Sequence, residues 1–196
     1  MNRLLAPIIA AVLGIASALA AAQTPLSIKP LAEKKVKQLP AGELYWRIEN
    51  VGSLESARAA AGEWGLATES AGKVWLFTLG AKGASTGAGT KVAEVGPIPR
   101  PEASEYLLRI NEATGAPGAI TAIHSHPGSE AFYVLAGEQS IRGAHGTMKV
   151  ASGQPAAGHG ADMPMQVWSS GTVDLHSLVM FVVDANRPFS TPAQLP

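Results

Sequence analysis

Apolar and polar positions alternate with a period of two over residues 118–137, GAITAIHSHPGSEAFYVLAG, the spacing that puts every second side chain on one face of a β-strand. The alternation is interrupted at residues 127–129, a Pro-Gly-Ser sequence that suits a tight turn. The pattern therefore predicts a β-hairpin. The positions that share a face are Ile120, Ala122, His124 and His126 before the turn, and Glu130, Phe132, Val134 and Ala136 after it.

Short apolar segments on both sides of this hairpin are separated by turns rich in glycine, proline and serine. The ordered part is predicted to begin at residues 43–49, and further strands are predicted at residues 64–68, 73–79, 92–95, 106–110, 140–142, 147–150, 165–168 and 174–183. One short helix is predicted to begin after Ser53, whose hydroxyl suits an N-cap, and to end at Gly62. Roughly nine or ten short strands with one minor helix predict an all-β fold, either a sandwich or a barrel.

The composition of the 196-residue chain narrows the chemistry that this fold can carry. Basic and acidic residues both number 15, so no net charge favours a nucleic-acid partner. Cysteine is absent from the sequence, which excludes disulfides, thiolate metal sites and cysteine nucleophiles. A metal ion would therefore be held by nitrogen and oxygen ligands, with a methionine thioether as the soft alternative.

The N-terminus has the features of an export signal. Within residues 1–22, Arg3 supplies a positive charge, an apolar segment follows, and Ala-Leu-Ala at residues 18–20 suits signal cleavage. These features predict an exported protein, periplasmic or secreted, with no stable membrane span after cleavage. The alternative is an uncleaved membrane anchor at residues 4–22, which is about as long as a bilayer-spanning helix.

The remaining chain divides into three predicted parts. Residues 23–42 combine prolines and lysines without apolar periodicity, which predicts a flexible, solvated lead-in. Residues 43–104 are predicted to form an N-terminal β extension that packs on a barrel. Residues 105–196, which contain the hairpin, are predicted to form the core domain.

Three side chains of the predicted hairpin suit a metal site. In the predicted register His126 and Glu130 lie opposite each other with Cβ atoms roughly 5 Å apart, and His124 is the next neighbour on the same face. Two imidazoles and a carboxylate would then converge on one point. The other histidines are less constrained by pattern, and His145 is predicted to be solvated at the tip of a glycine-rich turn.

The spacing of these residues resembles a known family. Gly118, five residues, His124-x-His126, three residues, Glu130, six residues and Gly137 match the first signature of the cupin superfamily. The resemblance covers residues 105–183 well and residues 43–100 only by general β character. It implies a double-stranded β-helix, the jelly-roll barrel of cupins, with a divalent metal held inside by His124, His126 and Glu130. Because cupins commonly pair through their sheets, it also implies a homodimer.

The second cupin signature is altered in this chain. Its expected histidine is replaced by Met165, at the end of residues 160–165. Three side chains are candidates for the fourth ligand. Met165 would be a weak ligand better suited to copper than to manganese or iron. His159 lies between two glycines in a flexible segment, and His176 shares a strand face with Leu178 and Met180 and could point inward.

Three interpretations of the site remain open from the sequence. The two histidines and one carboxylate could form an open metal face of the kind that non-heme iron oxygenases use. His159 or His176 could complete the ligand set. The barrel could instead hold a small organic ligand without metal. The metal itself, whether Fe, Mn, Zn, Ni or Cu, is not distinguished.

The functional hypotheses follow from these interpretations. The first is a metal-dependent oxygenase or isomerase that acts on a small molecule inside the barrel. The second is a non-catalytic exported cupin that binds or senses a small ligand. A further acid or base facing the cavity would favour the enzyme, and the nearest candidates are Asp162, Gln166 and Tyr133. No catalytic residue is assigned from the sequence.

Overall fold

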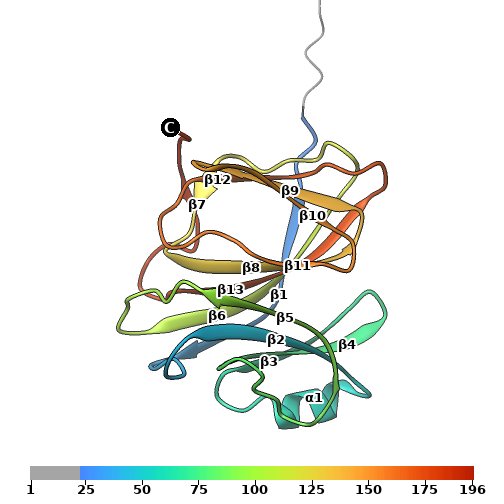
Figure 1. Ribbon diagram of the computed structural model, residues 1–196, viewed down its shortest axis with the longest axis vertical. Coiled ribbons are helices and arrows are strands. Elements are labelled where there is room, and N and C mark those ends of the chain that lie inside the picture. The colour runs from blue at the N-terminus through green and yellow to red at the C-terminus, as the bar shows by residue number, and fades with distance from the viewer. Residues whose placement is uncertain (1–22) are drawn as a thin grey trace, which may run out of the picture.

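Three antiparallel sheets and one helix form the part of the protein that the computed structural model describes, residues 23–196. The sheets are stacked in layers, with the helix beyond the last of them (Figure 1). The predicted export signal at residues 1–22 lies outside the described residues. No helix among residues 23–196 is long and apolar enough to cross a membrane.

The middle layer, sheet B, is buried on both sides. Its strand order is β1-β6-β13-β8-β11. The strands are β1 (Ser27–Val36), β6 (Tyr106–Gly115), β13 (Leu175–Asp184), β8 (Gly128–Ala136) and β11 (Pro155–Ala157). The central strand β13 is apolar at nearly every position, because even-numbered side chains such as Met180 face one neighbouring sheet and odd-numbered ones such as Phe181 face the other.

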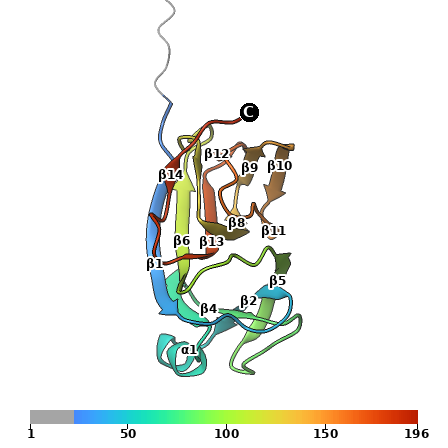
Figure 2. The same ribbon diagram turned by 90° about the vertical axis from the view of Figure 1, so that its left-hand side faces the viewer.

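Sheet A closes a barrel over one face of sheet B (Figure 2). Its order is β10-β9-β12-β7-β14. The strands are β10 (Gly146–Ala151), β9 (Glu138–Gly143), β12 (Met165–Ser169), β7 (His124–Ser125) and β14 (Thr191–Pro192). Side chains from both sheets, including Phe132, Ile141 and Val179, form the core between them. The predicted all-β jelly-roll fold is confirmed.

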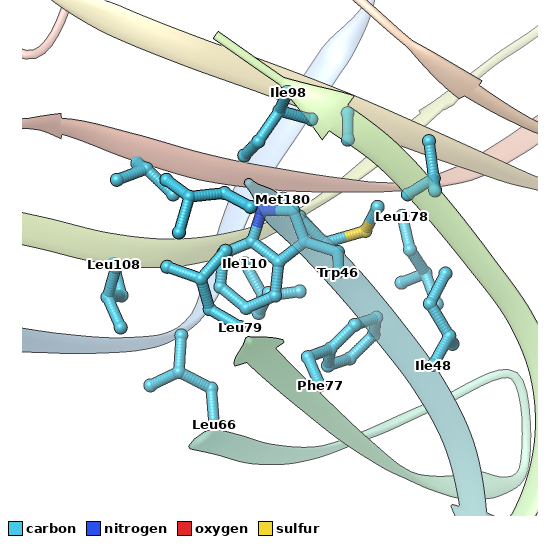
Figure 3. Packing of buried hydrophobic residues seen from close by; sticks show 14 of the residues in the cluster. Trp46, Ile48, Leu66, Phe77, Leu79, Ile98, Leu108, Ile110, Leu178 and Met180 are labelled. Carbon is cyan, nitrogen blue, oxygen red and sulfur yellow. The ribbon is translucent and has the colours of Figure 1, made fainter. Parts of the chain in front are cut away.

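Sheet C covers the other face of sheet B. Its order is β3-β4-β2-β5, with β2 (Leu44–Val51), β3 (Gly65–Ser70), β4 (Lys73–Gly80) and β5 (Thr90–Ile98). Trp46 and Phe77 of sheet C pack against Ile110 and Met180 of sheet B (Figure 3). Helix α1 (Leu54–Ala60) lies on sheet C, and Ser53 caps it as predicted by accepting a hydrogen bond from the backbone N–H of Ser56 at 3.1 Å.

The prediction of a flexible lead-in over residues 23–42 is wrong. Strand β1 occupies ten of these residues and pairs with β6 along its length. It is an edge strand in which Lys29 and Lys35 are exposed, whereas Lys34 is half-buried and donates hydrogen bonds to the Gly62 and Gly65 carbonyl oxygens. Pro30 lies at a register shift where no ladder donor is needed. Because most of its side chains are exposed, the strand lacks the apolar alternation by which a strand is recognised in sequence.

The predicted hairpin over residues 118–137 is also wrong in its pairing. Strand β7 belongs to sheet A, where it pairs with β12 and β14, whereas β8 belongs to sheet B and pairs with β13 and β11. Pro127 therefore links two sheets rather than two neighbouring strands. The first position of β8, Gly128, has no room for a side chain, because a Cβ there would lie 2.1 Å from the Val182 carbonyl oxygen. Periodicity predicts which face a side chain occupies, and it does not specify the partner strand.

Candidate metal and ligand site

A cavity of about 500 Å³ lies inside the barrel between sheets A and B. Its walls are mostly apolar, with Phe132 from β8, Phe181 from β13 and Phe189 from the C-terminal segment. His124, His126 and Glu130 all line this cavity. The side chains that the sequence placed together therefore meet in one space, although they reach it from two sheets rather than from one hairpin.

His126 lies where the chain crosses from sheet A to sheet B, and it is 4% exposed. Its Nδ1 donates a hydrogen bond to the Phe189 carbonyl oxygen at 2.6 Å. Burial lowers the pKa of His126, and the nearby Glu130 carboxylate opposes this only in part. A neutral imidazole whose Nδ1 carries the proton leaves its Nε2 lone pair free to bind a ligand.

The ring of His124 is also oriented by a hydrogen bond from Nδ1 to a backbone carbonyl. Its Nδ1 donates to the Ala122 carbonyl oxygen at 2.8 Å, and its ring lies edge-on to that of His126 with centroids 4.9 Å apart. A carbonyl oxygen can only accept, so Nδ1 carries a proton, and the neutral form of this ring has its lone pair on Nε2. Metal-bound histidines are usually oriented by this type of outer hydrogen bond.

Glu130 supplies a carboxylate from β8. The residue is 2% exposed, and its Oε1 has no hydrogen-bond partner among the described residues. The nearest imidazole nitrogen is Nδ1 of His159, at 3.7 Å, which also lacks a hydrogen-bond partner within residues 23–196. A buried carboxylate oxygen and a buried imidazole nitrogen that face each other beyond hydrogen-bond distance are unusual in a folded protein.

Two glycines make room for His159 and Glu130. A Cβ on Gly143 would lie 2.3 Å from His159 Nε2, and a Cβ on Gly158 would lie 2.6 Å from Cγ of Glu130. His159 therefore has a defined place against sheet A and next to Glu130. The sequence indicated that it could reach the site and gave no direction for it.

Met165 lies between His124 and Gly143 in the ladder of sheet A. It pairs with His124 on one side and with Gly143 on the other, and it is 1% exposed. Because directly opposed residues point to the same face of a sheet, its thioether is on the same side as His124. Among residues 23–196, neither Met165 nor His159 borders the cavity itself.

The suggestion that His176 is a ligand of this site is wrong. Its Nε2 lies 2.8 Å from Oε1 of Glu112 and 3.1 Å from the hydroxyl of Ser70 on β3. It shares a face with Leu178 and Met180 as predicted, but that face packs against sheet C. A strand that is apolar on both faces gives no indication of which face borders the cavity.

The Glu112 carboxyl group in this outer cluster titrates below its ordinary range. Partial burial acts to raise its pKa, but hydrogen bonds from Ser70 and His176 outweigh this effect and lower it. Ser70 donates to Glu112 Oε1 at 2.5 Å. Glu112, Ser70 and His176 therefore bond to one another, and the cluster joins sheet B to sheet C.

The candidate acids and bases beyond the three ligands do not border the cavity. Tyr133 packs on Trp75 of sheet C with ring centroids 6.1 Å apart. Asp162 is held by two hydrogen bonds from Arg187, and Gln166 bonds to Arg142. The sequence missed two buried amides that do border it, those of Asn111 and Gln139. The one feature of the sequence that could have indicated Gln139 is its polar side chain at a position that shares a strand face with Ile141.

The donors fit a divalent metal in kind and in hydrogen bonding. The same cavity is lined by two histidines whose Nδ1 atoms are hydrogen-bonded and by a glutamate with one unpartnered carboxylate oxygen. Within residues 23–196, however, no three histidine, aspartate or glutamate side chains already surround a single metal position. The candidate donors thus border one cavity, and their side chains are not gathered around a single point.

Several solved structures resemble part of this chain. A cupin-like protein from Thermotoga maritima is 15% identical over 45% of this chain and 65% of its own, with a TM-score of 0.40. A DMSP lyase from Ruegeria pomeroyi is 18% identical over 44% of this chain and 43% of its own, with a TM-score of 0.38. A protein with a double-stranded β-helix domain from Klebsiella pneumoniae is 21% identical over 44% of this chain and 75% of its own, also at 0.38.

No protein-family model and no curated protein sequence matches the chain. The similarity to DMSP lyases spans less than half of their length, 44% and 43% of the two matched chains. The fold assignment therefore rests on the strand pairing of the structure itself. The described chain is a double-stranded β-helix barrel, and it resembles the cupin superfamily in this fold and in the residue pattern of positions 118–137.

Proposed function

We propose that the protein is a metal-dependent enzyme, an oxygenase or isomerase, that acts on a small molecule inside the barrel. His124, His126 and Glu130 would hold the divalent metal. The observation that carries this proposal is the combination of two Nδ1-anchored imidazoles with an unpartnered buried carboxylate oxygen at one cavity. Such groups are costly to bury unless a ligand completes them.

A bound divalent metal would supply Lewis acidity and open coordination positions for the substrate. The protein residues have the tasks of orientation and water exclusion. The Ala122 and Phe189 carbonyls fix the two imidazoles through Nδ1, so that Nε2 would be the metal-binding atom of each ring. Phe181 and Phe189 pack edge to face at 4.9 Å beside His126 and shield the site from solvent.

His159 is the fourth ligand that we propose in place of the missing histidine. Its unpartnered Nδ1 faces the unpartnered Oε1 of Glu130, and the glycine at position 143 leaves room for its ring. Met165 lies in the same ladder as His124 but carries a soft donor. We therefore expect His159, rather than Met165, to bind iron, manganese or zinc.

Elemental analysis of the purified, metal-loaded protein tests the metal site. We expect about one metal per chain in the parent and in His176→Ala, because His176 belongs to the outer cluster. His124→Ala and Glu130→Ala should both lose the metal, since a site of three or four ligands rarely retains it after losing one. A parent protein without metal under metal-replete conditions would contradict the proposal.

A second function, non-catalytic binding or sensing of a small ligand, is supported by a different observation. The cavity walls are mostly apolar, and the candidate ligands are not gathered around one metal position within the described residues. Retention of a small-molecule ligand by metal-free protein, with no turnover after metal loading, would favour this function over the enzyme.

Export is part of the proposal and rests on the signal predicted at residues 1–22. Cleavage after Ala20 or Ala22 would release the part of the chain that folds into the three sheets. Mass spectrometry of the mature protein from a bacterial host tests this. A mass that corresponds to a chain starting at residue 21 or 23 is expected, and a full-length membrane-bound product would support the anchor instead.

A further inference from the structure

Unpartnered polar atoms are found in the barrel beyond the proposed metal site. Gln139 of β9 is 0% exposed, and neither its Oε1 nor its Nε2 has a hydrogen-bond partner within residues 23–196. Ser169, directly opposite Gln139 in the ladder between β9 and β12, has an unpartnered hydroxyl among the same residues. On sheet B, Asn111 is 2% exposed and its Oδ1 is unpartnered as well. Gln139 and Asn111 both border the cavity.

Packing alone does not explain the amide of Gln139. The side chain occupies the barrel-facing phase of β9 that continues with Ile141, a position that a leucine or methionine would fill without burying polar atoms. Buried polar groups are nearly always hydrogen-bonded, and a site that leaves both atoms of an amide unpaired is one that a complementary ligand can complete. Gln139 thus has the properties of a recognition group.

The ladder of sheet A sets the distance between this amide and the proposed metal centre. His124 pairs with Met165, and Met165 pairs with Gly143 at the end of β9. Gln139 lies four residues earlier on the same strand, and four residues of strand span about 13 Å. The amide and the histidines therefore face one cavity from positions well separated along the strands.

The charge of the cavity limits the ligand. Glu130 is the carboxylate that borders it, among the described residues, and it would repel a second carboxylate in the absence of metal. Phe132, Phe181 and Phe189 contribute aromatic surface to the walls of this cavity. A neutral molecule with a flat apolar body suits these walls.

We propose that Gln139 binds the polar head of a neutral small molecule that offers a hydrogen-bond donor and an acceptor side by side, as a carboxamide or lactam does. An amide side chain presents one acceptor and donors in a plane, so such a head satisfies both orphaned atoms at once. The apolar body, on the order of 10 Å in length, extends toward the histidines. The proposed contact between this head and Gln139 does not depend on the proposed enzymatic function. Only the expectation that the molecule reacts at its other end, next to the histidines, rests on that function.

Cinnamamide is a probe with this chemistry, and propenylbenzene and cinnamate are its matched controls. Calorimetric titration of metal-free protein should show cinnamamide binding at least tenfold more tightly than either control. Gln139→Met should weaken cinnamamide at least tenfold and leave propenylbenzene unchanged. The matched control Gln166→Met, whose amide bonds to Arg142 outside the cavity, should leave cinnamamide binding unchanged.

A second readout separates recognition from a structural role. Gln139→Met should raise the melting temperature, by about 2–4 °C, because it removes an unpaired buried amide. A lowered melting temperature would identify Gln139 as a structural residue and overturn the proposal, as would equal binding of cinnamamide and propenylbenzene. Metal content is independent of these outcomes, so a protein that binds metal and not cinnamamide refutes this inference alone.

Discussion

The two faces of sheet B have the same β13 strand in common and differ in what covers them. Toward sheet C the contact is dense, with Trp46, Trp75 and Phe77 all 2% exposed or less, although the indole N–H of Trp46 lacks a partner among the described residues. At this interface Glu112 and His176 bond to each other. Toward sheet A the same sheet borders a cavity of about 500 Å³.

Three polar side chains on the cavity side have buried atoms that are left unpaired by the residues that the structure describes. Glu130, Asn111 and Gln139 each bury an atom without a hydrogen-bond partner within residues 23–196. Unpaired buried polar groups lower stability and are retained where a ligand uses them. We infer that the outer interface, between sheets B and C, stabilises the fold. The inner face of sheet B, which borders the cavity toward sheet A, carries the function.

The largest expected effect is a loss of stability from the outer interface. Phe77→Ala should lower the free energy of unfolding by about 3–5 kcal/mol, because its ring is fully enclosed. Phe181→Ala on the cavity side should cost less, since part of that ring already faces empty space. Urea denaturation measures both, and equal losses would break the contrast between the two faces.

A smaller effect is expected in the outer polar cluster. Ser70→Ala removes the hydrogen bond to Glu112 at 2.5 Å and the contact with His176 at 3.1 Å. Loss of a hydrogen bond to a charged group should lower the free energy of unfolding by about 1.5–3 kcal/mol. Metal content should stay at the parent value. Loss of metal in this variant would connect the outer cluster to the site and contradict its purely structural role.

A further metal-binding side chain can be introduced at the inner site to test its geometry. Met165→His places an imidazole directly opposite His124, so it should tighten Mn²⁺ or Fe²⁺ binding about tenfold, which is ~1.4 kcal/mol. Competition with a fluorescent chelator measures the affinity. Unchanged affinity would show that the thioether position does not reach the metal.

The smallest expected effect is a pH dependence that arises from the outer cluster. The pKa of Glu112 is lowered, so its stabilising contribution is fully present above the ordinary glutamate value and is lost as the pH falls through the lower folded value. Glu112→Gln should flatten the decline of melting temperature in this acidic range and leave the neutral range parallel to the parent. An unchanged acidic slope would argue against the assigned hydrogen bonds.

The sequence predicted which side of a strand a residue faces better than it predicted which strands pair with each other. The alternation around His124 and Glu130 correctly placed both side chains toward one interior, yet it could not show that β7 and β8 join different sheets. The edge strand β1 was missed because its residues are mostly exposed and show no apolar period. His176 was misplaced because β13 is apolar on both faces, so neither face is distinguished by composition.

Nitrogen chemical shifts of the histidines, followed by NMR during Zn²⁺ addition, test the central claim most directly. The account predicts that Nε2 of His124 and His126 shifts on binding, with His159 as the third responding imidazole, while His145 and His176 stay unchanged. These residues are the five histidines of the sequence. Shifts at His176 without shifts at His124 and His126 would place metal on the outer face and contradict the account.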